Sequence, residues 1–294
     1  MTPTVACFDD ETEPAGRLAL ALGAPLAPVR LHRFPDGESL PVVATPASGT
    51  VIVYRSLDHP NAKLIELLLA ADAWRRAGAG RLILVAPYFC YLRQDAVFAP
   101  GEPLSRDVIA PLVGAGFDAV VTVQGHLHRT HDLGAVLGKP ARNLWAVDPL
   151  ADALPVYASP PLVVGPDAES APWSEAWARR LGGEAVTLTK VRTGDRRVAI
   201  SGDISAAGRP VLIVDDVASS GETLRQAIDL TRTAGAATID VAIVHALLGP
   251  RALRRLRDAG ARSIVSTDSV RHPTNAAHLA PLLAQAVTDL IEGP

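Results

Sequence analysis

Short apolar runs rich in β-branched residues alternate along the chain with longer stretches whose apolar positions recur at helical spacing. The first pattern is typical of buried strands and the second of amphipathic helices. The clearest helical stretches are 62–77 and 222–234, and the strand-like runs are Thr50–Tyr54, Arg81–Pro87, Ala119–Val123, Leu162–Gly165, Pro210–Val214, Ile239–Val244 and Ser263–Ser266. Because strands and helices alternate, we predict an α/β fold with a parallel, doubly wound sheet.

This alternation runs twice through the chain, which predicts two tandem domains. A length of 294 residues suits two domains of ordinary size. A Pro- and Ala-rich stretch, Ala151–Pro161, separates the two passes, and we place the boundary near residue 145. The predicted domains are therefore 1–145 and 146–294, each with a mainly parallel sheet flanked by helices. The segment Asn275–Ile291 is predicted to form a last helix, which packs either on its own domain or back on the first.

The composition is that of a soluble globular protein, with 48% hydrophobic and 20% charged residues. A formal net charge of −3 and the lack of a basic run argue against binding to a polynucleotide. The chain starts without a signal-peptide pattern and has no apolar run of membrane-spanning length, so we expect a cytoplasmic location and no membrane contact. The two cysteines, Cys7 and Cys90, are interpreted as buried thiols.

The segment 211–223 carries the strongest chemical signal. An apolar strand ends in two adjacent acids and is followed by a loop of small residues and an amphipathic helix. Backbone N–H groups at the start of that helix form a seat for a phosphate dianion, whereas the acids are suited to accept hydrogen bonds from sugar hydroxyls. The pattern therefore predicts a site for a ribose 5-phosphate group. Its predicted ligands are Asp215, Asp216, Ser219, Ser220, Gly221 and Thr223.

Two charged segments of the predicted second domain also have interpretations that involve no ligand. The segment 211–223 is also compatible with an ordinary turn in which a serine caps the helix and the acids are solvated. Two carboxylates at the end of a buried strand are costly without a partner, which favours the binding interpretation. Lys190 and Arg192 stand two apart in a polar segment that is suited to close over phosphates. Their spacing alone favours a solvated charged face with Arg196 and Arg197.

The segment 211–223 resembles the phosphoribosyl diphosphate (PRPP) motif of the type I phosphoribosyltransferase fold. Six further segments, in family order, extend the resemblance to the ribose-phosphate diphosphokinase (PRPP synthetase) family. They are Arg33–Glu38, Ala86–Asp95, Gly101–Ser105, Val164–Asp167, Thr189–Arg192 and Thr267–Ser269. Several short motifs in one order are far more specific than any one of them alone. The resemblance implies two tandem phosphoribosyltransferase-type domains.

The same resemblance implies a reaction of MgATP with ribose 5-phosphate that yields AMP and PRPP. It assigns Phe34, Asp36 and Glu38 to ATP bound at a neighbouring subunit, and Arg93 and Gln94 to the nucleotide. It places Mg²⁺ on His126 and Asp167, and catalysis on Lys190 and Arg192. The implied assembly is a homo-oligomer built from dimers, such as a hexamer, with ATP and ribose 5-phosphate as its small-molecule partners.

Histidines at positions 126, 128 and 131 support a competing interpretation. Their spacing after a predicted strand also suits the zinc site of a binuclear metallohydrolase. Thr130 stands where such hydrolases place an acid, and no second cluster matches the first. We therefore prefer Mg²⁺ at His126 and assign no role to His128 or His131.

Three departures from the commonest family pattern keep other functions open. Gln124 and Ser219 stand where acids are usual, and Glu169 follows Asp167 where glycine is frequent. Loss of these carboxylates affects metal affinity or the sugar accepted. The alternatives are a divergent paralogue that acts as a phosphoribosyltransferase and a regulatory homologue without catalysis. The segment Gly134–Pro140 lacks the spacing of a Walker A loop, so the ATP site must be built by other means.

Overall fold

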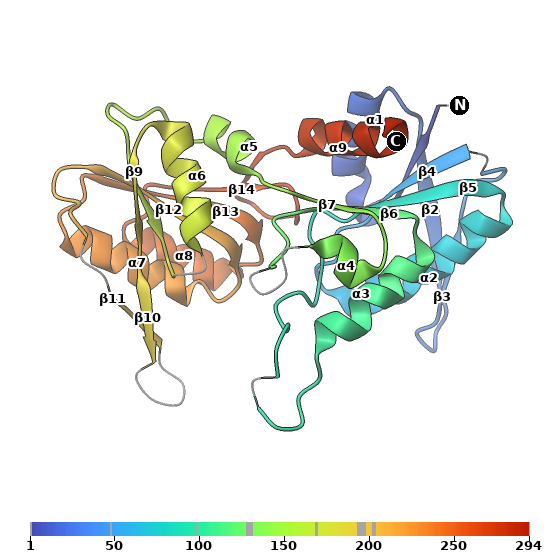
Figure 1. Cartoon of the computed structure of the whole chain (residues 1–294), viewed down its shortest axis with the longest axis horizontal. Coiled ribbons are helices and arrows are strands. Elements are labelled where there is room, and N and C mark those ends of the chain that lie inside the picture. Colours follow the sequence, from blue (N-terminus) through green and yellow to red (C-terminus); the bar gives the residue numbers. More distant parts are fainter. Residues whose placement is uncertain are drawn as a thin grey trace. The chain divides into compact units, whose positions relative to one another are not determined.

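The computed structural model describes residues 2–47, 49–97, 99–127, 132–167, 170–192, 198–201 and 204–293. The chain divides into two compact units (Figure 1). Unit 1 comprises Met1–Leu144 and Leu279–Pro294, and unit 2 comprises Trp145–His278. Each unit has a mainly parallel sheet flanked by helices, which confirms the predicted α/β fold class. Within the described ranges, none of the helices combines the length and the apolar character that a membrane span requires.

Unit 1 contains a seven-stranded sheet in the order β3-β2-β1-β4-β5-β6-β7. The strands are β1 (Thr4–Phe8), β2 (Leu26–Arg33), β3 (Ser39–Val42), β4 (Gly49–Tyr54), β5 (Ala79–Val85), β6 (Ala119–Val123) and β7 (Ala141–Leu144). Neighbouring strands are parallel except β2 and β3, which form an antiparallel hairpin. The carboxyl ends of β2, β1, β4, β5 and β6 therefore lie at one edge of the sheet, where α/β proteins bind ligands.

Helices cover both faces of this sheet (Figure 1). They are α2 (Pro60–Arg76), α3 (Ser105–Gly116) and α4 (Leu133–Leu137) on one face, and α1 (Thr12–Leu22) and α9 (Ala280–Glu292) on the other. A short 3₁₀ turn, η1 (Asp9–Glu11), connects β1 to α1. Leu64 and Leu67 of α2 share a core cluster with Val53 of β4 and Leu84 of β5. Because both faces are covered, the central strands are almost continuous apolar runs.

Unit 2 contains a six-stranded, fully parallel sheet in the order β15-β14-β13-β12-β8-β9. The strands are β8 (Leu162–Gly165), β9 (Glu184–Thr187), β12 (Pro210–Ala218), β13 (Thr238–Ala246), β14 (Ser263–Thr267) and β15 (Asn275–Ala277). A separate antiparallel ribbon, formed by β10 (Thr189–Arg192) and β11 (Val198–Ser201), projects from this unit (Figure 1). Strand β11 contacts helix α7 (Glu222–Thr233), so the ribbon packs beside that helix.

The helices of unit 2 have clear apolar faces. They are α5 (Val147–Asp152), α6 (Ala171–Leu181), α7 and α8 (Pro250–Ala259). In α8, Ala252, Leu253 and Leu256 are buried, whereas the intervening arginines are exposed, which is the pattern of an amphipathic helix. Helices α7 and α8 pack against each other and share one core cluster with the strands.

Two predicted elements need correction. The predicted strand Pro210–Val214 continues through both acids to Ala218, because β13 pairs with this part of the chain as far as Ala246. The predicted last helix begins at Ala280 and not at Asn275, because residues Asn275–Ala277 pair with β14 as the edge strand β15.

Candidate active site

Strand β12 carries the two predicted sugar-binding acids at the carboxyl edge of the unit 2 sheet. Asp215 and Asp216 are half-buried, and the carboxylate of Asp216 accepts a hydrogen bond of 2.7 Å from the backbone N–H of Val217. Pairing with β13 continues past the acids, whereas pairing with β8 ends at Ile213. The acids therefore have a strand on one side only, and they lie beyond the last pair with β8.

The loop after β12, predicted to bind phosphate, turns directly into helix α7. Ser219 and Ser220 are exposed, and Gly221 adopts a left-handed conformation with a φ of 72° immediately before α7. A Cβ atom on Gly221 would lie 3.0 Å from Cδ2 of Leu248, so both the backbone and the packing favour glycine. The hydroxyl of Ser220 accepts a bond of 3.3 Å from the N–H of Glu222. The chain thus turns tightly into a helix whose first N–H groups lack partners within the helix.

The carboxylate that follows this loop in sequence is paired with a cation, so it does not exclude an anion from the loop. Glu222 lies in the first turn of α7, but its carboxylate accepts hydrogen bonds from Arg225 at 2.6 Å and from Gln226 at 3.1 Å. These bonds lower the pKa of Glu222 to about 2. The guanidinium of Arg255 donates to the carbonyl of Ser220 at 3.2 Å. An arginine therefore holds the loop itself, and a second arginine compensates the nearby carboxylate.

Two other groups of predicted residues follow strands β8 and β9 of unit 2. Val164 of β8 pairs with Ile213 of β12, and Asp167 follows the end of β8. The carboxylate of Asp167 accepts a bond of 3.2 Å from the N–H of Ser170. Lys190 and Arg192 lie on β10, which follows β9, the neighbour of β8. Residues 193–197, the remainder of the predicted catalytic segment, and Glu169 lie outside the described residues.

In unit 1 the predicted ATP-binding hairpin connects β2 to β3. The N–H of Phe34 donates to the carbonyl of Glu38 at 2.8 Å, and Gly37 turns the chain with a φ of 95°. The carboxylate of Asp36 accepts a bond of 3.2 Å from the N–H of Glu38. Phe34 is 40% exposed and meets the ring of His32 edge to face at 4.6 Å between centroids. The hairpin therefore presents an aromatic ring and two acids to solvent.

The other residues predicted to contact the nucleotide follow the ends of β5 and β6. Arg93 is exposed, whereas Gln94 is half-buried and accepts a bond of 2.7 Å from the hydroxyl of Ser105, the first residue of α3. His126 is half-buried and stands two residues after Gln124, whose N–H donates to a β7 carbonyl at 2.7 Å. Since β5 and β6 are parallel neighbours, both groups belong to the carboxyl edge of the unit 1 sheet.

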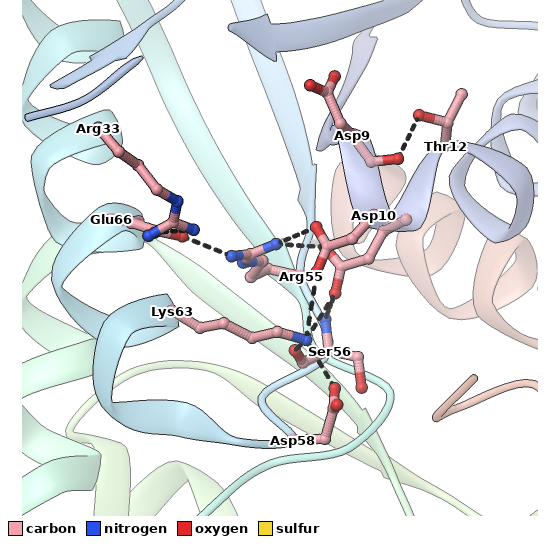
Figure 2. A network of polar contacts seen from close by, with 10 residues as sticks. Asp9, Asp10, Thr12, Arg33, Arg55, Ser56, Asp58, Lys63 and Glu66 are labelled. Carbon is pink, nitrogen blue, oxygen red and sulfur yellow. Dashed lines mark hydrogen bonds and ion pairs between the residues drawn. The ribbon is translucent and has the colours of Figure 1, made fainter. Parts of the chain in front are cut away.

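A network of charges around the buried Arg55 at this edge is not apparent from the sequence (Figure 2). Its centre is Arg55, the residue after β4, which donates to Asp10 at 2.7 Å, Glu11 at 3.2 Å and Glu66 at 2.7 Å. Figure 2 shows Arg55 between Glu66 and Asp10. The network comprises Asp10, Glu11, Arg33, Arg55, Ser56, Asp58, Lys63 and Glu66. The only sequence signal is a charged residue directly after the apolar run Thr50–Tyr54.

Burial controls the protonation of this network. Glu11 is 5% exposed, and burial raises the pKa of its carboxyl to about 7, although Arg55 and Lys63 lower it. Its oxygens accept hydrogen bonds from the N–H of Ser56 at 2.7 Å and from Arg55. Lys63 donates to Asp58 at 2.7 Å and to the carbonyl of Ser56 at 2.9 Å. Each of these charges thus has an opposite partner, which a buried charge requires.

Comparison with known proteins assigns both units. Residues 5–116 match the model of the N-terminal domain of ribose phosphate pyrophosphokinase, and residues 152–280 match the phosphoribosyl transferase domain. A ribose-phosphate pyrophosphokinase of Methanopyrus kandleri is 37% identical over 278 residues, which cover 93% of this chain and 94% of that protein. The chain belongs to the ribose-phosphate pyrophosphokinase family.

Other members of the ribose-phosphate pyrophosphokinase family are similar over the same extent. The protein named for this activity in Halobacterium salinarum is 34% identical and covers 93% of this chain and 96% of its own length. The crystal structure of phosphoribosylpyrophosphate synthetase from Mycobacterium smegmatis superposes with a TM-score of 0.85 at 24% identity and covers all of both chains. Pyrophosphokinase and diphosphokinase name the same activity. The family predicted from seven motifs, including the PRPP motif, is therefore confirmed. The fold matches that of the Mycobacterium smegmatis structure as well.

Each unit offers a side chain that suits the Mg²⁺ ion that the ribose-phosphate pyrophosphokinase family implies. In the described part of the chain, no group of three or more His, Cys, Asp or Glu is able to hold a metal ion. Mg²⁺ is usually held by one or two carboxylates together with substrate phosphates and water. Asp167 offers a carboxylate, and the side-chain oxygen of Gln124 is buried with no hydrogen-bond partner among the described residues. His128 and His131, which the zinc interpretation needs, lie outside those residues.

Proposed function

We propose that this family member transfers the β,γ-diphosphoryl group of ATP to the 1-hydroxyl of ribose 5-phosphate and releases AMP and PRPP. The observation that carries the proposal is one chain with two matched domains, each with predicted ligand residues that follow strands of a mainly parallel sheet. A phosphoribosyltransferase needs the elements of unit 2 but has no use for an ATP hairpin. The pairing of both sets of elements therefore favours a diphosphokinase.

The sugar phosphate binds in unit 2. Its phosphate occupies the loop 219–221 and the hydroxyl of Thr223, where backbone N–H groups and the helix dipole of α7 stabilise a dianion. Asp215 and Asp216 accept hydrogen bonds from the ring hydroxyls. With both ends held, the 1-hydroxyl of the sugar is oriented for attack, which lowers the entropic part of the barrier.

The transfer itself depends on positioning and charge. The 1-hydroxyl oxygen forms a bond to the β-phosphorus as the bond to the α-phosphate oxygen breaks, so the electron pair leaves on AMP and the hydroxyl proton is released. Lys190 and Arg192, on the β10–β11 ribbon, offset the negative charge of the transferring group. Phe34 stacks on adenine, Asp36 and Glu38 accept its hydrogen bonds, and Arg93 and Gln94 bind the phosphates.

Mg²⁺ is the implied cofactor, and Asp167 in unit 2 and His126 in unit 1 are each a residue that would hold such an ion. When bound with ATP, the ion supplies charge neutralisation to the phosphate oxygens. Because the hairpin 34–38 is exposed, we further propose that it serves the ATP site of a neighbouring subunit in a homo-oligomer. A site shared in this way is incomplete in an isolated chain.

The decisive experiment incubates the pure protein with MgATP and ribose 5-phosphate and separates the products by chromatography. AMP and PRPP should appear in equal amounts. In the double variant with Asp215→Asn and Asp216→Asn, kcat/KM for ribose 5-phosphate should fall by on the order of a hundredfold. The asparagine side chains have nearly the shape of aspartate but lack the negative charge that accepts hydrogen bonds from the sugar. Asp152→Asn, an exposed acid of α5, serves as the matched control. Absence of AMP from the wild-type reaction would sink the proposal.

The alternatives give different products in the same assay. A phosphoribosyltransferase consumes PRPP only when a base is added and forms no AMP from ATP. A regulatory homologue forms neither product. A zinc hydrolase retains about one or two zinc ions per chain through purification, which elemental analysis detects.

A further inference from the structure

Glu66 on α2 is a buried carboxylate that links two arginines (Figure 2). Its side chain is 1% exposed, and Oε2 accepts a hydrogen bond of 2.7 Å from Nη2 of Arg55. Nη2 of Arg33 lies 2.7 Å from the other oxygen, Oε1. This second contact is an ion pair without hydrogen-bond alignment, and Oε1 has no hydrogen-bond partner among the described residues. A buried carboxylate oxygen needs compensation, which Arg33 supplies here as charge.

The contact with Arg33 is what distinguishes Glu66 from the other acids of the network. Arg55 has two further carboxylate partners, Asp10 and Glu11, so it does not rely on Glu66 alone. Among the described residues, the ion pairs of Asp10 and Glu11 are with Arg55 and Lys63, and none reaches the hairpin that follows Arg33. Glu66 therefore connects the buried network to the end of β2.

Arg33 stands at the root of the ATP hairpin. It is the last residue of β2, pairs with Ser39 of β3 and immediately precedes Phe34. Residues 34–38 are all exposed, so burial contributes little to their orientation. Helix α2 is, by contrast, fixed in the core by Leu64 and Leu67. The ion pair thus ties the root of an exposed hairpin to a well-packed helix.

We propose that Glu66 is a positioning residue for the nucleotide: through Arg33 it holds the root of the hairpin 34–38 in the orientation that ATP binding needs. The proposal rests on the proposed function, because it takes the hairpin as an ATP-binding element. A preorganised binding element loses less conformational freedom when its ligand binds. The effect of Glu66 therefore falls on ATP affinity and not on the transfer step or on ribose 5-phosphate.

Arg33→Met is the first test, because it removes the cation and leaves the Glu66–Arg55 bond in place. The KM for ATP should rise about tenfold, whereas kcat and the KM for ribose 5-phosphate should change less than about twofold. Calorimetric titration with MgATP alone should show the same loss of affinity. Arg33→Lys, which keeps the charge, should recover most of it. The control is Arg76→Met, which breaks an exposed ion pair with Asp72 on the same helix and should leave all of these values unchanged.

A double-mutant cycle tests whether Glu66 acts through Arg33. Glu66→Gln alone should raise the KM for ATP as Arg33→Met does, and the double variant should be no worse than either single variant. Effects that multiply in the double variant would overturn the proposal. If Glu66→Gln does not fold, the Arg33 variants test the proposal alone. An unchanged affinity for ATP in Arg33→Met would then overturn the proposal. If the wild-type protein forms no AMP, the proposed function fails, whereas calorimetry with ATP still judges the role of Arg33.

Discussion

At the scale of single residues, Gly221 combines two constraints that can be separated by experiment. Its φ of 72° is nearly that of Gly208, which is 70°, but only at Gly221 would a Cβ atom meet another side chain. Gly208→Ala should therefore cost only the conformational penalty, about 1 kcal/mol of unfolding free energy. Gly221→Ala should cost more than this and also raise the KM for ribose 5-phosphate roughly threefold or more, because the loop must shift. Equal effects of the two substitutions on that KM would contradict the assignment of the loop.

Glu11 makes stability depend on pH in a predictable direction. The folded protein holds the Glu11 proton up to a pKa of about 7, whereas the ordinary value is 4.5. The folded state therefore binds more protons between these values, and the unfolding free energy falls as pH rises through this window. The total fall from this group is on the order of 3 kcal/mol. Glu11→Gln, which does not titrate, should remove it.

The measurement is urea unfolding of wild type and Glu11→Gln at about pH 5 and about pH 8, with the difference between the two proteins as the readout. The contributions of the other titrating groups to the unfolding free energy are the same in both proteins, so they cancel in that difference. Asp72→Asn, at an exposed acid of α2, should leave the wild-type pH dependence intact. Parallel pH curves for Glu11→Gln and wild type would mean that Glu11 ionises normally in the fold.

Residues of the candidate site were predictable where they are contiguous. Asp215, Asp216 and the predicted phosphate loop occupy one short segment, in which a strand, a loop and a helix follow one another. Such a segment can be recognised from the sequence alone. The Arg55 network was not predictable, because its members come from separate segments that only the parallel sheet brings together. Nothing in the spacing of Glu11 and Glu66 indicates that one arginine bridges them.

At the scale of elements, continuous apolar runs predicted the central strands well. The predicted runs Ala119–Val123 and Leu162–Gly165 coincide with β6 and β8, because both faces of those strands are buried. Strand β2 escaped prediction because it contains Pro28 and alternates apolar with charged residues beside the hairpin. Strand β12 was predicted too short, since two acids end the apolar pattern but not the pairing with β13.

The β10–β11 ribbon carries Thr189–Arg192 on a strand, β10, that includes both predicted catalytic cations. Lys190 lies opposite Ile200 in this ribbon, and β11 contacts α7, the helix that starts at the phosphate loop. Lys190→Ala should lower kcat by on the order of a hundredfold or more, because a cation over the transferring group acts on charge in the transition state. The denaturation midpoint should stay unchanged, and Lys139→Ala serves as a control in unit 1. An unchanged kcat would remove Lys190 from the mechanism.

At the scale of the whole molecule, the two units divide the proposed substrates between them. The predicted nucleotide elements belong to unit 1, and the predicted sugar-phosphate elements belong to unit 2. The exposed hairpin adds a division between subunits, because we assign its aromatic ring and acids to ATP bound at a neighbouring subunit. If this assignment holds, two defective chains should complement each other.

Asp36→Ala damages the hairpin, and Lys190→Ala removes the predicted catalytic lysine of the ribbon, so each variant alone should be inactive. In a mixed oligomer some shared sites receive an intact hairpin from one chain and an intact ribbon from the other, and activity should return to roughly a quarter of the wild-type value. Pull-down with a tag on one variant first verifies that subunits exchange. Mixtures of either variant with itself give the baseline. If verified mixed oligomers recover no activity, the hairpin serves its own chain, or Asp36 supports only the turn through its bond to Glu38.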